Sequence, residues 1–160
     1  MHQSPLRQQN SPTEETAYAQ NRHASRLFDG IAAGYDGLAE LFSGFQYGRW
    51  RRYLVSCISA QTNDKIIDVC TGTAGVALAT SKATGASVIG IDISPQMLER
   101  ARQKVMENGP KNRVALAIGC AENLPLADNS VDVVCFTFLL RYVDQPAKTI
   151  QELARVLRPG

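Results

Sequence analysis

The sequence Ile66-Ile67-Asp68-Val69-Cys70-Thr71-Gly72-Thr73-Ala74-Gly75 joins a short apolar run to a helical pattern through a turn of small residues. The apolar run is typical of a buried strand, and the helical pattern begins at Gly75. Such a turn lets a ligand approach the backbone, and the first turn of the helix offers free amide donors. Taken alone, the stretch fits both a ligand seat and a tight turn without a ligand.

The same alternation of strand and helix continues along the chain. The apolar runs predict strands over residues 65–69, 87–91, 113–118 and 131–138, and helical spacing predicts helices over 75–83, 95–108 and 145–157. The second helix has Ser94 as its N-cap, Pro95 at its first position and Gly109 just after its end. Strands that alternate with helices predict an α/β fold, a Rossmann-like parallel sheet buried on both faces.

The residues upstream of this α/β core divide into two parts. Residues 1–20 are rich in Gln, Ser, Pro and Thr, so we expect a disordered tail. Residues 21–62 predict an N-terminal helical cap, in which Trp50, Leu54 and Ile58 form one stripe of a helix over 47–59. With residues 63–160 as the α/β core, the 160 residues fit a single domain.

Composition excludes several classes of function. A net charge of +2, with no basic run longer than Arg51-Arg52, argues against a nucleic-acid partner. The most apolar stretch, 131–140, is too short to cross a membrane, and no signal peptide precedes the core, so we expect a cytoplasmic location. Four scattered cysteines and two upstream histidines indicate no metal site.

A carboxylate closes the second predicted strand. Asp92 follows the glycine turn by about 20 residues, where a carboxylate accepts both hydroxyls of a ribose in nucleotide-binding α/β folds. A helix cap or a solvated strand end would also explain Asp92. Together, the turn and Asp92 predict an adenosine-type ligand.

Four segments share their order and spacing with a known family. They are IDVCTGTAG (67–75), IDISPQML (91–98), AENLP (121–125) and VLRPG (156–160), and together they resemble the class I S-adenosyl-L-methionine-dependent methyltransferases. Three more segments, at 28–36, 49–51 and 140–141, resemble the ubiquinone/menaquinone C-methyltransferase subgroup. The similarity covers residues 27–160.

The resemblance implies S-adenosyl-L-methionine as cofactor, a small-molecule acceptor and a set of site residues. It places the methionine part of the cofactor on the turn, the ribose on Asp92, the adenine near Ile93 and Ala121, and the sulfonium near Thr137. The full cofactor set that it implies is Asp68, Thr71, Gly72, Thr73, Gly75, Asp92, Ile93, Met97, Cys120, Ala121, Glu122 and Thr137. Tyr35 would close the site from the cap, or belong to the cap's own core.

The chain departs from the subgroup at several positions that flank the site. Glycine is usual where Cys70, Ala74 and Leu139 stand, so the turn has to tolerate two β-carbons. Cys120 stands where an aspartate usually reads the adenine, and neighbouring Glu122 is a candidate substitute. Asparagine is usual where Ala39 and Tyr142 stand. Both positions flank the expected pocket for the acceptor, so these departures concern the quinone-like acceptor.

Arg141 follows the fourth predicted strand, beside the expected mouth of the site. A fixed cation there would stabilise the phenolate form of an acceptor methylated at carbon. A surface or loop-bridging cation is the alternative interpretation.

The sheet order expected for the four strands is 3-2-1-4, without the remainder of a seven-stranded sheet. The fourth strand would then be an open edge, which self-association or a partner chain would cover. Two functions compete with methyl transfer: a non-catalytic cofactor-binding remnant or interaction module, and an NAD(P)-dependent oxidoreductase, which shares a glycine turn and a ribose carboxylate.

Overall fold

A computed structural model describes residues 29–30, 34, 37, 46–110, 112–143 and 145–160. The predicted tail, half of the predicted cap and Tyr35 lie outside these residues. The main elements are α3 (Tyr47–Ser56), β1 (Lys65–Val69), α4 (Gly75–Thr84), β2 (Ser87–Asp92), α5 (Pro95–Asn108), β3 (Val114–Ile118), β4 (Val133–Phe136), the short 3-10 helix η2 (Leu139–Arg141) and α6 (Pro146–Val156). Strand and helix alternate from β1 to β3, and β4 follows β3 without a helix between them, as the sequence predicts.

The four strands form one parallel sheet in the order β3-β2-β1-β4. Strand β1 is central: Ile67 lies opposite Ile89 of β2 and Val134 of β4. The α/β class and the predicted strand order are both confirmed. In this order the carboxyl ends of β1 and β2 are neighbours, so the residues that follow them meet at one edge of the sheet.

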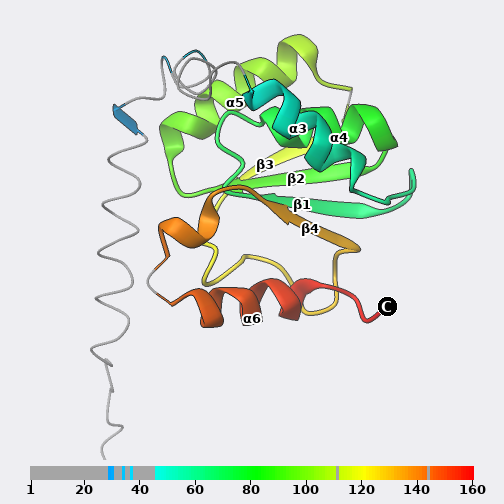
Figure 1. The fold of residues 1–160 in the computed structure, drawn as a ribbon, viewed down its shortest axis with the longest axis vertical. Helices are drawn as coiled ribbons and strands as arrows, with labels where there is room; N and C mark the ends of the chain where they lie inside the picture. The colour runs from blue at the N-terminus through cyan, green and yellow to red at the C-terminus, as the bar shows by residue number, and fades with distance from the viewer. Residues whose placement is uncertain (1–28, 31–33, 35–36, 38–45, 111, 144) are drawn as a thin grey trace, which may run out of the picture.

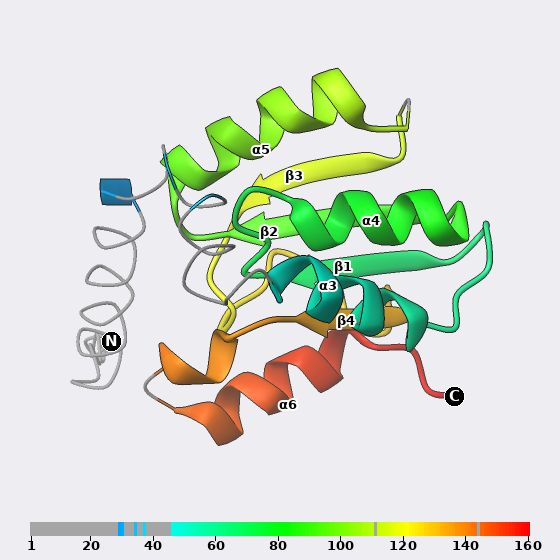
Figure 2. The same cartoon turned by 45° about the horizontal axis from the view of Figure 1, so that its top comes forward.

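Helices cover both faces of the sheet (Figures 1 and 2), with α3, α4 and α5 on one side and α6 on the other. Two clusters of buried side chains correspond to these layers. Ile66 and Val88 belong to the cluster under α4 and α5. Ile67 and Ile91 belong to the cluster that includes Leu153 of α6. Because successive strand residues point to opposite faces, the apolar run of β1 serves both clusters.

Helix α5 begins and ends as predicted. Ser94 caps it by accepting a hydrogen bond from the Met97 amide at 3.1 Å, and Pro95 stands at its first position. Gly109 directly follows the last helical residue, in an extended conformation with φ −79° and ψ 151°. A β-carbon at this position would lie 2.5 Å from the Val105 carbonyl oxygen, so the close approach of the backbone explains the glycine.

Strand β4 is shorter than the predicted 131–138. At its amino end, Val131 forms an isolated parallel bridge with Leu157, and Val131 accepts a hydrogen bond from the Arg158 amide at 2.9 Å. At its carboxyl end, Phe138 turns into the left-handed region and η2 follows. β4 is an edge strand: within the described residues, β1 pairs with one side of it and no strand pairs with its other side. That another chain covers this edge stays a prediction.

The three residues of the predicted α3 stripe differ in burial. Leu54 and Ile58 pack against the cluster under α4, but the Trp50 side chain is 55% exposed. Trp50 lies on the same side of α3 as Leu54, since both line one hollow, but it is not buried there. Among the described helices, none has the length and apolar character needed to cross a membrane.

Candidate functional site

The turn between β1 and α4 contains three residues in left-handed backbone conformations. Cys70, Gly72 and Ala74 have φ values of 58°, 55° and 62°. Glycine adopts this region without penalty, whereas a residue with a β-carbon loses about 1–2 kcal/mol there. The β-carbons of Cys70 and Ala74 thus stand where the backbone favours glycine. The Ala74 side chain is fully buried under α4, and its packing offsets part of that penalty.

Asp68 holds the turn against the start of α4. Its carboxylate is buried and accepts hydrogen bonds from the Thr71 hydroxyl at 2.7 Å and from the Ala77 amide at 3.1 Å. Burial raises the pKa of Asp68 to about 6, and the hydrogen bonds from Thr71, Cys135 and Ala77 oppose the rise. Asp68 is therefore a structural carboxylate that fixes the shape of the turn.

Asp92 joins the end of β2 to the same turn. One carboxylate oxygen accepts the Gly72 amide at 2.7 Å and the other accepts the Ser94 amide at 2.9 Å. Burial raises the pKa of Asp92, and the backbone hydrogen bonds oppose this. The Ser94 hydroxyl donates in turn to Asp29, so a residue upstream of the α/β core reaches this strand end. The glycine turn and the carboxylate therefore face a common space.

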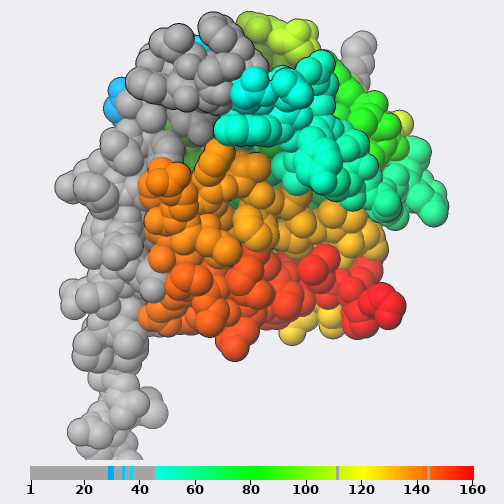
Figure 3. All heavy atoms as spheres, in the orientation of Figure 1, coloured from blue at the N-terminus to red at the C-terminus, as the bar shows by residue number. Residues whose placement is uncertain are grey.

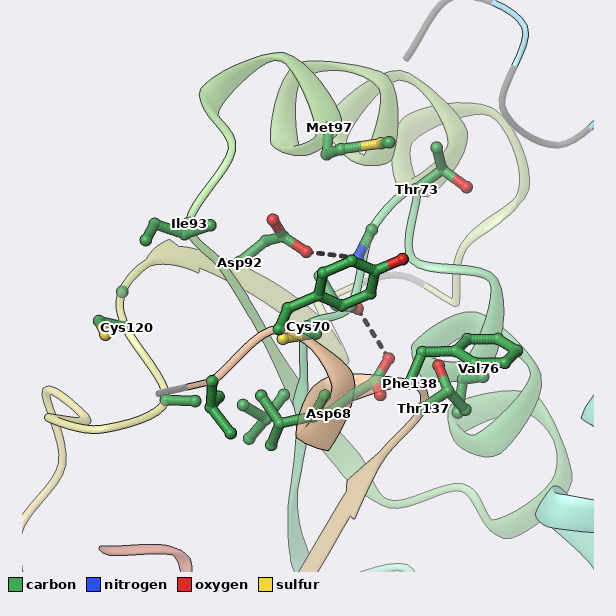
Figure 4. A pocket seen from close by; sticks show the side chains of 18 of the residues that line it. Asp68, Cys70, Thr73, Val76, Asp92, Ile93, Met97, Cys120, Thr137 and Phe138 are labelled. Carbon is green, nitrogen blue, oxygen red and sulfur yellow. Dashed lines mark hydrogen bonds between the residues drawn. The ribbon is translucent and has the colours of Figure 1, made fainter. Parts of the chain in front are cut away.

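That space is an open hollow of about 910 Å³ at the carboxyl edge of the sheet (Figure 4). Most of the residues predicted to hold a cofactor line it: Asp68, Thr71, Gly72, Thr73, Asp92, Ile93, Met97, Cys120, Ala121, Glu122 and Thr137. Figure 4 shows Asp92 between Ile93 and Met97 in one part of the site, and Thr137 and Phe138 beside Val76 in another. Residues from β1, β2 and the segments after β3 and β4 thus meet in one place.

Two predicted residues that the structure describes, Gly75 and Arg141, do not line the hollow. Gly75 belongs to the first turn of α4, where a β-carbon would lie 3.2 Å from a guanidinium nitrogen of Arg51. Arg141 is exposed at the end of η2, although Leu139 and Tyr142 on either side both line the hollow. Tyr35 lies outside the described residues.

Sequence reasoning missed Tyr47, Val76, Gly119 and Val143, which also line the hollow. Gly119 directly follows β3, so the rule that strand ends meet at one edge would have found it. Tyr47 comes from α3, a helix outside the α/β alternation. No local pattern in the sequence specifies which part of the sheet such a helix covers.

Cys120 and Glu122 form a pair at the far side of the hollow. The Cys120 thiol donates to a carboxylate oxygen of Glu122 at 2.7 Å. The Glu122 side chain therefore does point toward the position where the subgroup usually has aspartate. A carboxylate is present at this wall, supplied by a residue two positions further along the chain.

The lining matches an adenosyl ligand in its chemistry. Asp92 offers a carboxylate for hydroxyl donors, and Ile93 and Met97 offer apolar surface. At Gly72 no heavy atom lies within 4 Å of the place where a β-carbon would be, so the backbone is open to close approach. These residues therefore fit S-adenosyl-L-methionine.

In comparisons with known proteins, the matching family and the relatives are all named as methyltransferases. The family model described as the ubiE/COQ5 methyltransferase family matches residues 16–160. A demethylmenaquinone methyltransferase from Symbiobacterium thermophilum is 36% identical over 159 residues, which cover 98% of this chain and 61% of the relative. A ubiquinone/menaquinone biosynthesis C-methyltransferase from Geotalea daltonii is 38% identical over 136 residues, covering 84% of this chain and 58% of the relative.

Solved structures agree on the fold. A putative methyltransferase from Haloferax volcanii, solved in complex with the Trm112 methyltransferase activator, has a TM-score of 0.70 and 28% identity, covering 83% of this chain and 56% of that one. A putative S-adenosyl-L-methionine-dependent methyltransferase from Methanococcus maripaludis has a TM-score of 0.72 and 20% identity, covering 82% of this chain and 60% of that one. At that identity the second likeness concerns the fold alone.

The chain spans about three fifths of the length of the curated relatives that it matches. The resemblance noted from the sequence motifs is confirmed by the family match and by the identity of 36–38% to these relatives. The chain belongs to the ubiE/COQ5 methyltransferase family.

Proposed function

We propose that the protein containing this chain transfers a methyl group from S-adenosyl-L-methionine to a carbon atom of a small quinone-like or phenolic acceptor. One observation supports this more than any other: the Asp92 carboxylate and the Gly72 amide, from the ends of two strands, meet at 2.7 Å in one hollow. The relatives named as quinone-biosynthesis methyltransferases point to the acceptor class.

Each side of the hollow has a proposed task in binding the cofactor. Asp92 accepts the ribose hydroxyls, and the turn at Gly72 receives the methionine part. Ile93 packs against the adenine, and the Ala121 amide hydrogen-bonds to it. Asp68 does not need to touch the ligand, because its bonds to Thr71 and Ala77 already fix the shape of the turn.

When bound, S-adenosyl-L-methionine supplies a methyl group on a positively charged sulfur, and transfer leaves a neutral thioether. Such a displacement depends on alignment and on exclusion of water more than on a strong acid or base. Val69, Val76 and Leu139 make the nearby wall apolar. Phe138 adds an aromatic ring there, and a ring face attracts a cation.

Arg141 and Tyr35 retain their proposed catalytic roles on weaker grounds. Arg141 lies between two residues that line the hollow, and its exposed guanidinium is available to an acceptor oxygen at the rim. The role of Tyr35 rests on the sequence resemblance alone.

Calorimetric titration with S-adenosylhomocysteine tests the cofactor assignment. Replacing Asp92 by Asn keeps the size of the side chain but removes the charge and turns one of its two acceptor oxygens into a donor, and a hydrogen bond to a charged group contributes about 1.5–3 kcal/mol. We therefore expect the affinity to fall roughly tenfold to a hundredfold. Asp128→Asn is the matched control, since Asp128 is exposed and is not part of the lining. Equal affinities for wild type and Asp92→Asn would refute the assignment.

Methyl transfer is tested separately, with the complete protein and a naphthohydroquinone as acceptor. Transfer of a labelled methyl group to ring carbon is the expected result. Binding of S-adenosylhomocysteine without transfer to any hydroquinone would instead favour the cofactor-binding module.

A further inference from the structure

The loop that follows β3 forms one wall of the cofactor hollow and lies against α6. Cys120, Ala121 and Glu122 of this loop line the hollow, and the loop continues through Leu124 toward β4. In Figure 1 the loop passes beside α6, and the space-filling view (Figure 3) shows α6 at the surface of the molecule. Contacts between the loop and α6 therefore help to fix where this wall lies.

An ion pair on α6 binds the backbone of the loop. The Arg155 guanidinium donates to both carboxylate oxygens of Glu152, each at 2.7 Å. The same carboxylate accepts the Leu124 amide at 2.7 Å. The guanidinium also donates to the Leu124 carbonyl at 3.4 Å and to the Leu126 carbonyl at 2.9 Å. One ion pair thus binds both backbone groups of Leu124.

These bonds lie largely out of solvent. The Glu152 side chain is 14% exposed and the Arg155 side chain is 31% exposed. Leu124 is buried and belongs, with Ala121, to the same apolar cluster as Leu153 of α6. Hydrogen bonding to Arg155 lowers the pKa of Glu152, so the carboxylate stays a charged acceptor. Because a buried amide without an acceptor is unfavourable, Glu152 favours one position of Leu124.

The several donors of a guanidinium suit this contact. Nε and Nη2 of Arg155 face Glu152, while Nη1 and Nη2 donate to the two loop carbonyls. Asp128 also accepts from Nη1, but its side chain is 69% exposed, so this pair contributes little. A planar group with donors at fixed angles therefore sets the distance between α6 and the loop.

The segment that α6 holds directly follows the lining residues. Leu124 comes three residues after Ala121 and two after Glu122. Cys120 and Asn123 form an isolated bridge, in which the Asn123 amide donates to the Cys120 carbonyl at 3.1 Å. This tight turn joins the lining residues to Leu124. A fixed position of Leu124 therefore also restricts where the Ala121 amide and the Glu122 carboxylate lie.

We propose that Glu152 and Arg155 are positioning residues for recognition of the adenine base: they hold the loop so that the Ala121 amide and the Glu122 carboxylate lie along the edge of the base. Neither Glu152 nor Arg155 lines the hollow, so both act through the loop. The proposal rests on the proposed function and adds to it the selectivity of the site for adenine. Polar groups held in place reject an analogue that leaves them unpaired.

Two ligands that differ only in the base measure this selectivity. In S-inosylhomocysteine an oxygen replaces the 6-amino group of adenine, and N1 carries a hydrogen. By calorimetry, the wild-type protein should bind S-adenosylhomocysteine roughly tenfold more tightly than S-inosylhomocysteine. Equal affinities of the wild type for the two ligands would overturn the proposal, because the wall would then not read the base.

Arg155→Ala tests the positioning role, and Arg158→Ala is its matched control. Arg158 also binds a carboxylate and a loop carbonyl, those of Asp132 and Ser130, but Asp132 accepts the Lys65 amide at the amino end of β1, away from the hollow. Arg155→Ala should lower the ratio of the two affinities roughly fivefold to tenfold, and Arg158→Ala should keep it within about twofold of wild type. Equal ratios in the two variants would contradict the proposal.

A general loss of stability does not imitate the expected result, since an unfolded fraction lowers the binding of both ligands alike and leaves their ratio unchanged. If Arg155→Ala does not fold, Arg155→Lys replaces it. A lysine keeps a cation beside Glu152, but its single nitrogen does not replace the three of the guanidinium, so the ratio should still fall, and an unchanged ratio would refute the positioning role.

The same titrations distinguish this proposal from the proposed function. If the wild type binds neither ligand, the proposed function fails and this inference fails with it. If the wild type prefers S-adenosylhomocysteine and the Arg155 variants keep that preference, only the positioning role fails.

Discussion

Replacing Asp68 by Asn should remove a large part of the pH dependence of stability. The Asp68 carboxyl has a pKa of about 6 in the folded protein, above its ordinary value of 3.8, because it is buried. Between these two values the folded protein holds a proton that the unfolded chain has already lost. The free energy of unfolding therefore falls as the pH rises through this window.

The magnitude follows from the width of the window. Each pH unit between the two pKa values lowers the free energy of unfolding by about 1.4 kcal/mol, so ionisation of Asp68 lowers it by about 3 kcal/mol in total. More than about 2 kcal/mol of this change lies between pH 4 and pH 7. An asparagine at this position does not ionise, so this share of the pH dependence should disappear.

The difference in stability between pH 4 and pH 7 does not depend on how well the new side-chain amide of Asp68→Asn fits its surroundings. In the Asp68→Asn variant the new amide group would lie near the Cys135 thiol, a weak partner, and the variant could be less stable than wild type at every pH. Such an offset is the same at both pH values and cancels in the difference. The pH dependence therefore isolates the ionisation of Asp68.

Urea denaturation followed by circular dichroism at pH 4 and pH 7 measures both proteins. Wild type should lose about 2 kcal/mol more than Asp68→Asn between the two pH values. Asp128→Asn is the control for the loss of a carboxylate at an exposed position, where Asp128 pairs with Arg155. An Asp68→Asn variant with the same pH dependence as wild type would refute the reasoning.

Three further substitutions separate folding from binding. Gly72→Ala should lower the free energy of unfolding by about 1–2 kcal/mol, because φ at Gly72 is 55° although nothing lies within 4 Å of the new β-carbon, and it should also weaken S-adenosylhomocysteine binding; unchanged affinity in calorimetry would contradict this. Gly90→Ala places a β-carbon 2.8 Å from the Thr71 hydroxyl, so overpacking should destabilise the fold by about 1–3 kcal/mol; a melting temperature equal to that of wild type would count against it. Arg141→Ala should lower methyl transfer while leaving S-adenosylhomocysteine affinity unchanged, and full turnover would rule out its catalytic role.

The sequence predicts the sheet well because its signals are local. The apolar run at 65–69 and the cap at Ser94 identify their elements without knowledge of the rest of the chain, and β1 and α5 have the predicted bounds. The rule that parallel strand ends meet at one edge then places the glycine turn beside Asp92. The prediction of an adenosine-type ligand follows from these two steps, whereas the other cofactor residues are implied by the family resemblance.

What the sequence does not predict depends on contacts between distant segments. The apolar pattern of 131–138 continues through Phe138, but its backbone leaves the sheet there and turns left-handed. Gly109 looks like a helix cap, yet it is glycine because the Val105 carbonyl lies against it. The exposure of Trp50 likewise depends on where α3 meets β4, which helical spacing does not encode.

Cys70 and Ala74 have a consequence for how members of this family are recognised. The shape of the ligand-binding loop depends on backbone torsion angles, and glycine is only the residue that meets them with least strain. A search pattern that requires glycine at positions 70 and 74 would reject this chain, although its loop has three residues in left-handed conformations.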